Sequence, residues 1–160
     1  MPIITEQDKT FMREAIRLAD ESVKNGGGPF GAVIVKDGEI VAGSANSVTI
    51  DNDPTAHAEV NTIRQACRKL GTFNLSDCVI YTSCEPCPMC LGAIYWARIK
   101  RIYYGNTKKD AADIDFADDF IYRELELHKE NRSVPLISLL RDEAIKTFKA
   151  WKQKEDRVEY

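Results

Sequence analysis

The sequence lacks several features that would assign it to a particular class of protein. No run approaches the roughly 20 apolar residues that a membrane-spanning helix needs, and we see no repeats and no low-complexity linker. Basic residues are not in excess: 22 Lys and Arg stand against 25 Asp and Glu, giving a net charge of −3. This balance argues against a large electrostatic surface for nucleic acid. We therefore expect neither a membrane partner nor a nucleic-acid partner.

Cysteine is scarce and its number is odd, with five in 160 residues. An odd count without a signal peptide does not fit the disulfide framework of a secreted protein. We expect a reduced, cytoplasmic protein. The length fits one domain over residues 1–160, long enough to bury roughly 68–70% of the unfolded surface.

The most informative stretch is Cys-Glu-Pro-Cys-Pro-Met-Cys at 84–90. Pro88 suits the first position of a helix, where its missing N–H has no partner to lose. Cys87 and Cys90 then lie three residues apart and face the same side. By itself this pair fits redox chemistry, structural zinc or catalytic zinc. Upstream, His57 offers an imidazole ligand, and Glu59 follows it by two residues.

Together His57, Cys87 and Cys90 supply three metal ligands. A structural zinc site is closed by four ligands, whereas a catalytic one keeps the fourth position for water or hydroxide. We therefore predict one catalytic Zn²⁺, with Glu59 moving protons between water and substrate. The alternative is a non-catalytic zinc module, which would need no Glu59 and for which Cys84 is the nearby fourth ligand.

Hydrophobic spacing predicts alternating helices and strands. A first helix runs through Phe11 to Val23 and ends at the glycines 26–28, and a hairpin follows around the Asp-Gly turn at 37–38. The next helix begins near Pro54 and carries His57 and Glu59. A strand at 79–82, the metal-binding helix and a strand at 101–104 form a βαβ unit with parallel strands. This order predicts an α/β fold: a mixed sheet of about five strands with helices on both faces.

The segment after Gly105 differs in composition. Aspartates crowd positions 110–119, and composition alone favours a solvated acidic helix face. Ile137, Leu139 and Leu140 suggest a last short strand or the approach to a helix. Residues 141–160 then form a C-terminal amphipathic helix and a charged tail.

Several of these stretches resemble a known family. They are Gly-Gly-Pro-Phe-Gly-Ala-Val (27–33), Asn-Asp-Pro-Thr-Ala-His-Ala-Glu-Val (52–60), the run from Tyr81 to Arg98 and Asp-Asp-Phe-Ile-Tyr (118–122). His-x-Glu followed by Pro-Cys-x-x-Cys is the signature of the zinc nucleobase deaminases. The chain resembles the bacterial guanine deaminases of the cytidine deaminase superfamily from about Phe11 to its last residues.

The resemblance implies a three-layer α/β/α, cytidine-deaminase-like fold and zinc-dependent hydrolysis of guanine to xanthine and ammonia. It matches Asn46 to a residue that hydrogen-bonds the base, and Asp118 to an acid that contacts the guanine edge and relays protons. It makes Phe30 and Trp96 walls of the pocket, and Tyr160 its closure. It also implies a homodimer in which segments such as 141–160 exchange between subunits.

Two other enzyme functions stay open. One is deamination of guanosine or of another small aminated heterocycle. The other is deamination of adenosine in tRNA, which uses the same zinc motifs on a base flipped out of RNA. Such an enzyme should carry a basic face for phosphates, and the basic residues Arg98, Lys100 and Arg101 read more simply as charges flanking a strand.

Overall fold

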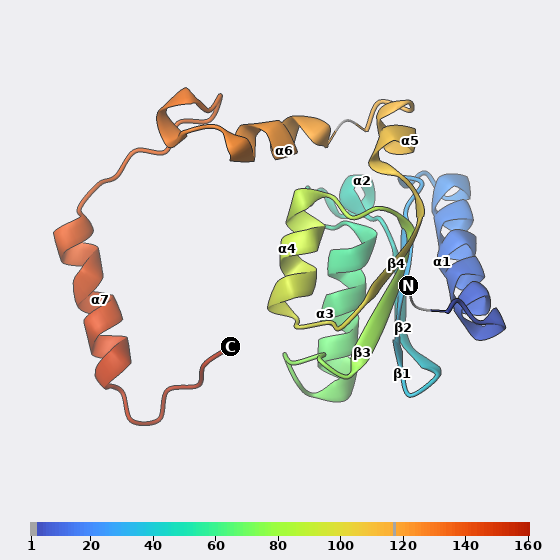
Figure 1. Cartoon of the computed structure of the whole chain (residues 1–160), viewed down its shortest axis with the longest axis horizontal. Helices are drawn as coiled ribbons and strands as arrows, with labels where there is room; N and C mark the ends of the chain where they lie inside the picture. Colours follow the sequence, from blue (N-terminus) through green and yellow to red (C-terminus); the bar gives the residue numbers. More distant parts are fainter. Residues whose placement is uncertain (1–2, 117) are drawn as a thin grey trace. The chain divides into compact units, whose positions relative to one another are not determined.

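The computed structural model describes residues 3–116 and 118–160, and these divide into two compact units, Met1–Asp119 and Phe120–Tyr160. The expectation of one domain over 1–160 stays a prediction beside this division. No helix in the described part of the chain is both long and apolar enough to cross a membrane. The described residues of the first unit form four strands: β1 (Gly31–Lys36), β2 (Glu39–Ala45), β3 (Cys78–Cys84) and β4 (Ile102–Asn106) (Figure 1). They also form five helices: α1 (Glu6–Lys24), α2 (Val48–Asp51), α3 (Ala58–Leu70), α4 (Pro88–Trp96) and α5 (Lys108–Ala112).

The sheet has the order β2-β1-β3-β4 and is mixed, as predicted. β1 pairs antiparallel with both β2 and β3, whereas β3 and β4 are parallel and joined by α4, which confirms the βαβ unit. The described residues form four strands, not the five or so that we expected. Residues 137–140, the candidate for a further strand, instead lead into a helix that begins at Arg141.

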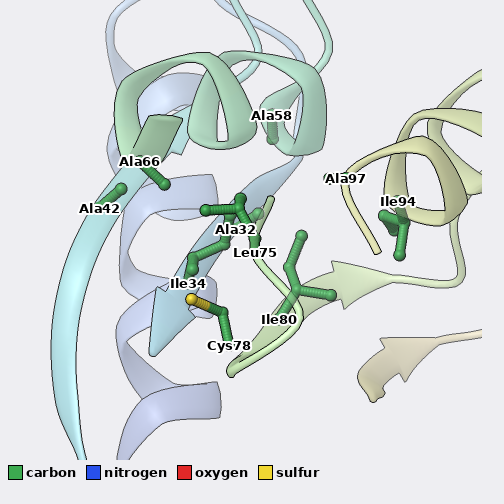
Figure 2. Close-up of a cluster of buried hydrophobic side chains, with 10 residues drawn as sticks. All are labelled: Ala32, Ile34, Ala42, Ala58, Ala66, Leu75, Cys78, Ile80, Ile94 and Ala97. Atoms are coloured by element: carbon green, nitrogen blue, oxygen red, sulfur yellow. The ribbon is translucent and has the colours of Figure 1, made fainter. Parts of the chain in front are cut away.

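Helices cover both faces of the sheet, which confirms the three layers (Figure 1). α1 lies on one face, where Phe11, Ala15, Val33, Val35 and Tyr81 form a buried cluster. α3 and α4 lie on the other face, over a cluster that Figure 2 shows. It contains Ala32, Ile34, Ala42, Ala58, Ala66, Leu75, Cys78, Ile80, Ile94 and Ala97. Consecutive residues of β1 thus face opposite layers, as the period of two in a strand requires, and both sets are buried.

The N-terminus of α1 is fixed by a capping box and by a bond to the sheet. The Thr5 side chain accepts from the Asp8 backbone N–H, and the Asp8 carboxylate accepts from the Thr5 N–H. The second carboxylate oxygen of Asp8 accepts a 2.5 Å hydrogen bond from the Tyr81 hydroxyl on β3. Helix and sheet also approach closely at Gly31, where an added Cβ would lie 2.3 Å from the Ala15 carbonyl oxygen.

One end of the sheet gathers the segments that matter for function. Gly31 at the start of β1 pairs with Ala45 at the end of β2, and Cys84 at the end of β3 pairs with Asn106 at the end of β4. The fold therefore brings residue 30, residue 46 and the segments after 84 and 106 to the same end of the sheet. The end beyond the carboxyl termini of parallel strands is where α/β sheets bind ligands.

The second unit contains α6 (Asp119–Glu126) from its second residue onward, a 3₁₀ turn at Lys129–Asn131 and α7 (Arg141–Gln153). The C-terminal helix expected within 141–160 is thus confirmed, with a tail after it. Neither α6 nor α7 has a buried residue.

Candidate metal centre

The three predicted ligands lie at the N-termini of two helices. His57 is the N-cap of α3 and Cys87 is the N-cap of α4, both with extended backbone. Pro88 occupies the first turn of α4, as its spacing predicted, and Cys90 lies in the same turn. Helix N-termini carry unpaired N–H groups and partial positive charge, which favour anionic sulfur. The Cys90 N–H lies 3.5 Å from the Cys87 sulfur accordingly.

The distances within this group fit a tetrahedral zinc ion. The His57 Nδ1 atom lies 3.6 Å from the Cys87 Sγ and 3.4 Å from the Cys90 Sγ, and all three ligand atoms lie within 4.8 Å of one another. Usual Zn–N and Zn–S bond lengths at a tetrahedral angle place nitrogen and sulfur about 3.6 Å apart. The ligand atoms of His57, Cys87 and Cys90 are thus spaced to bind one shared ion.

The protonation of the two thiols also fits a cation. Hydrogen bonds from the Cys90 thiol, and then from His57 and the Cys90 N–H, lower the pKa of Cys87 below its ordinary value. The neighbouring Cys87 sulfur, with burial, raises the pKa of Cys90. A divalent cation bound here would displace the thiol proton, leaving two thiolates.

Cys84 is not part of this group. Its Sγ lies 3.8 Å from the Thr107 carbonyl oxygen, to which it donates, and burial raises its pKa to about 11. Among the described residues, the cluster of potential ligands consists of His57, Cys87 and Cys90. Three ligands leave a coordination position open, which is the arrangement of catalytic and not of structural zinc.

Glu59 lies beside the ligands and is almost fully buried, with 6% of its surface exposed. The Thr82 hydroxyl donates to its Oε1 at 3.3 Å, and the Cys90 thiol donates to its Oε2 at 3.4 Å. Burial raises the pKa of Glu59 above its ordinary value. A buried carboxyl with a raised pKa takes up a proton more readily than an ordinary carboxylate, and it can return that proton later in the reaction. Sequence reasoning missed Thr82, although it lies in the buried strand that leads into the cysteine motif.

Asn46 and Phe30 lie at the same end of the sheet. The Asn46 N–H donates to the Phe30 carbonyl oxygen at 3.0 Å, and the Asn46 side chain accepts from the Val48 N–H at 3.2 Å. The Phe30 ring meets the Phe116 ring edge-on, with centroids 5.0 Å apart. Phe116 was also missed, because composition gave no reason to separate it from the acidic residues around it.

Asp118 has a buried carboxylate oxygen and is therefore not a fully solvated acid. Its Oδ1 is buried and has no hydrogen-bond partner among the described residues. Burial raises the pKa of Asp118, and the nearby Cys87 sulfur raises it further. The composition-based interpretation of a solvated acidic face therefore does not hold for this residue.

The remaining two predicted residues, Trp96 and Tyr160, have largely exposed side chains. Trp96 is the last residue of α4, six residues beyond Cys90, and 68% of its surface is exposed. Tyr160 belongs to the second unit and is also exposed. Their roles stay predictions.

Comparison with known proteins identifies a family model, described as the cytidine and deoxycytidylate deaminase zinc-binding region, that matches residues 5–106. The chain is 53% identical to guanine deaminase of Bacillus subtilis over 153 residues, covering 95% of this chain and 98% of that protein. It is 40% identical to a tRNA-specific adenosine deaminase of the same organism over 99 residues, 62% of each chain.

A solved structure gives the same result for the fold. An X-ray structure of guanine deaminase from Bacillus subtilis superposes with a TM-score of 0.93 at 51% sequence identity. The superposition covers 98% of this chain and 99% of that one. The likeness therefore includes residues beyond the region that the family model matches.

Proposed function

The chain belongs to the family of cytidine and deoxycytidylate deaminases with a zinc-binding region, and on that premise we propose that it hydrolyses guanine to xanthine and ammonia. The assignment of guanine as the substrate rests on the likeness to a guanine deaminase over 95% of this chain, which extends well beyond the shared zinc motifs. His57, Cys87 and Cys90 hold the Zn²⁺. When bound, the ion supplies Lewis-acid activation of water.

Glu59 is the proton carrier in this proposal. It takes a proton from water as the oxygen bonds to C2 of the base, and it delivers that proton to a ring nitrogen. It then moves the remaining hydroxyl proton to the exocyclic amine, so that the C2–N bond breaks and ammonia leaves. The Thr82 hydroxyl holds one carboxyl oxygen of Glu59 in place, and burial keeps competing water away.

Asp118 and Asn46 read the edge of the base. Guanine presents two donors side by side, the N1–H and the exocyclic amine, which suit a carboxylate acceptor. The buried Oδ1 of Asp118, with no partner in the described chain, supports this role. For Asn46, the bond from the Val48 N–H orients the amide oxygen, so that the amide nitrogen is the group offered to an acceptor on the base.

Phe30 forms a wall of the pocket, supported by its edge-on contact with Phe116 at the same end of the sheet. A flat purine needs apolar walls with a few polar groups at its edge. We keep Trp96 as a second wall and Tyr160 as the closure on the strength of the family resemblance.

We further propose a homodimer that exchanges C-terminal segments. α4 is apolar on all sides, yet only Cys90 and Ile94 are buried, and Met89 and Tyr95 are exposed. α6 and α7 also lack any buried residue. Helices with unburied apolar faces are typical of surfaces that contact another chain.

A cytoplasmic location is supported by the five cysteines, all in the described part of the chain and none in a disulfide.

The experiment that tests the function is release of ammonia by the zinc-loaded protein. Guanine is the test substrate, and guanosine, adenine, cytosine and an adenosine-containing tRNA stem-loop are compared with it. We expect release from guanine alone. Release from guanosine but not guanine would keep the zinc chemistry and overturn the substrate. Release from the stem-loop alone would place the chain with the tRNA deaminases, which the net charge of −3 argues against.

A further inference from the structure

Glu85 joins the cysteine-bearing loop to the segment that follows β4. Its backbone N–H donates to the Asn106 carbonyl oxygen at 2.7 Å. Its Oε2 accepts from the Lys108 backbone N–H at 3.0 Å, and the preceding residue, Cys84, donates to the Thr107 carbonyl oxygen. The last residue of β4 and the two residues after it are thus bonded to Cys84 and Glu85.

The bond to Lys108 completes the N-terminus of α5. The Thr107 side chain accepts from the Asp110 N–H, and the Asp110 carboxylate accepts from the Thr107 N–H. This capping box leaves the Lys108 N–H, the first of the helix, to find an acceptor elsewhere, and Glu85 provides it. A helix of five residues is too short to be stable alone, so such contacts decide whether it forms.

α5 in turn sets the position of the residues that face the site. Ala111 is buried, and its carbonyl oxygen accepts from the Phe116 N–H at 3.0 Å. The Phe116 carbonyl oxygen accepts from the Asp118 N–H at 3.2 Å, while the Phe116 ring meets Phe30. An unbroken series of contacts therefore runs from Glu85 through α5 to Asp118.

We propose that Glu85 is a positioning residue, whose hydrogen bond to the Lys108 N–H holds α5, and through it Phe116 and Asp118, against the metal-binding loop. The effect on catalysis rests on the proposed function, since Asp118 meets substrate only under that proposal. The hold on α5 does not rest on it. Glu85 itself touches neither substrate nor metal in this role.

Two substitutions separate the hydrogen bond from the negative charge. Glu85→Ala removes both, whereas Glu85→Gln keeps an oxygen that can accept from Lys108. Glu39→Ala, which removes an exposed acid from the hairpin at the start of β2, is the matched control. Three experiments are made on the full-length, zinc-loaded proteins. They measure zinc per chain, hydrogen–deuterium exchange of residues 107–116, and the steady-state kinetics (kcat and KM) with guanine.

We expect Glu85→Ala to keep its zinc while the amides of α5 exchange about tenfold faster and KM for guanine rises about tenfold, with a smaller change in kcat. Glu85→Gln should restore most of the protection and most of the KM, and Glu39→Ala should match the unsubstituted protein. Unchanged exchange of α5 in Glu85→Ala would overturn the proposal, and so would exchange in Glu85→Gln as fast as in Glu85→Ala. Loss of zinc would also overturn it, because Glu85 would then act on the ligands.

The exchange measurement separates this proposal from the proposed function. If the unsubstituted protein does not act on guanine, the proposed function fails, and the exchange of α5 in the two variants still decides whether Glu85 holds the helix.

Discussion

The Nδ1 atom of His57 lies 3.4 Å from the Sγ atom of Cys90, 33 residues further along the chain. The two residues meet because α3 and α4 pack on the same face of the sheet and begin at the same end of it. Each helix N-terminus then offers a ligand to one point, with amide groups favouring negative charge there. The contact depends on the antiparallel pairing of β1 and β3 and the crossover through α4, and not on either motif alone.

Replacing Glu59 should separate metal binding from catalysis. Glu59→Gln keeps the size of the side chain and an oxygen for the Thr82 hydroxyl but cannot take up the proton from water. We expect stoichiometric zinc and a fall of about 10²–10⁴-fold in kcat. Metal analysis and steady-state kinetics on one preparation test this. A kcat within a few fold of the original would remove Glu59 from the mechanism.

Replacing a ligand should lose both the metal and stability. We expect Cys87→Ala to lose zinc and to unfold at lower temperature, because zinc binds the folded state. At zinc concentrations about a thousand times the dissociation constant, binding contributes about 4 kcal/mol. A chelator should lower the Tm of the unsubstituted protein in the same direction. Cys84→Ala is the matched control and should keep its zinc, because the Cys84 thiol donates to Thr107 instead. Loss of zinc from that variant would point to a closed, four-ligand site.

Removing the charge of Asp118 should weaken recognition of guanine. Asp118→Asn offers a donor where the base also presents donors, and leaving such a group unpaired costs about 1–3 kcal/mol. We expect kcat/KM for guanine to fall about 10- to 100-fold, the equivalent of that cost, with zinc unchanged. Asp113→Asn changes an exposed acid of the same segment and should have no effect. Equal kinetics in the two variants would show that Asp118 does not contact guanine and acts only as a solvated acid.

Asp8 should make stability depend on acid pH. Hydrogen bonds from the Thr5 side chain, then from the Tyr81 hydroxyl and the Thr5 backbone, hold the pKa of Asp8 below its ordinary value of 3.8. A lowered folded-state pKa contributes stability that is present above pH 3.8 and is lost as the pH falls through the folded-state value.

We therefore expect Asp8→Ala to lower the free energy of unfolding by about 1 kcal/mol at pH 7, in line with loss of a helix cap. The difference from the unsubstituted protein should shrink as the pH falls below 3.8. Urea unfolding at pH 7 and below pH 3.8 measures this difference in the free energy of unfolding. Asp20→Ala, on the exposed side of α1, is the control. A difference that does not change with pH would assign the effect to packing alone.

Deleting Tyr160 tests the closure of the pocket. We expect lower activity on guanine without a change in Tm or zinc content, because the side chain of Tyr160 is exposed. Sedimentation of the full chain tests the homodimer in parallel. An unchanged rate after the deletion would refute the closing role, and a monomer at working concentration would refute the exchange of segments.

The two cysteine ligands were predictable from the sequence because their spacing depends on local structure. Pro88 starts a helix and a spacing of three puts two cysteines on one side, whatever the rest of the fold does. The turn at Asp37–Gly38 was predictable for the same reason: both residues have positive φ, which the turn requires. The strand count was less secure, because a short apolar run such as 137–140 fits a strand as well as the approach to a helix.

By itself, the sequence determined the kind of site: one imidazole, two thiols and a carboxyl that is not a ligand, on an α/β scaffold. Only the tertiary structure decided which other groups join it. Thr82 contacts Glu59, Phe116 contacts Phe30 and Glu85 reaches Lys108 because β1, β3 and β4 align their ends in one register. The physical reason is the separation along the chain of the residues that interact. Helix starts and turns are set by neighbours a few residues apart, whereas burial, pKa and contact depend on residues that the chain brings together only after it has folded.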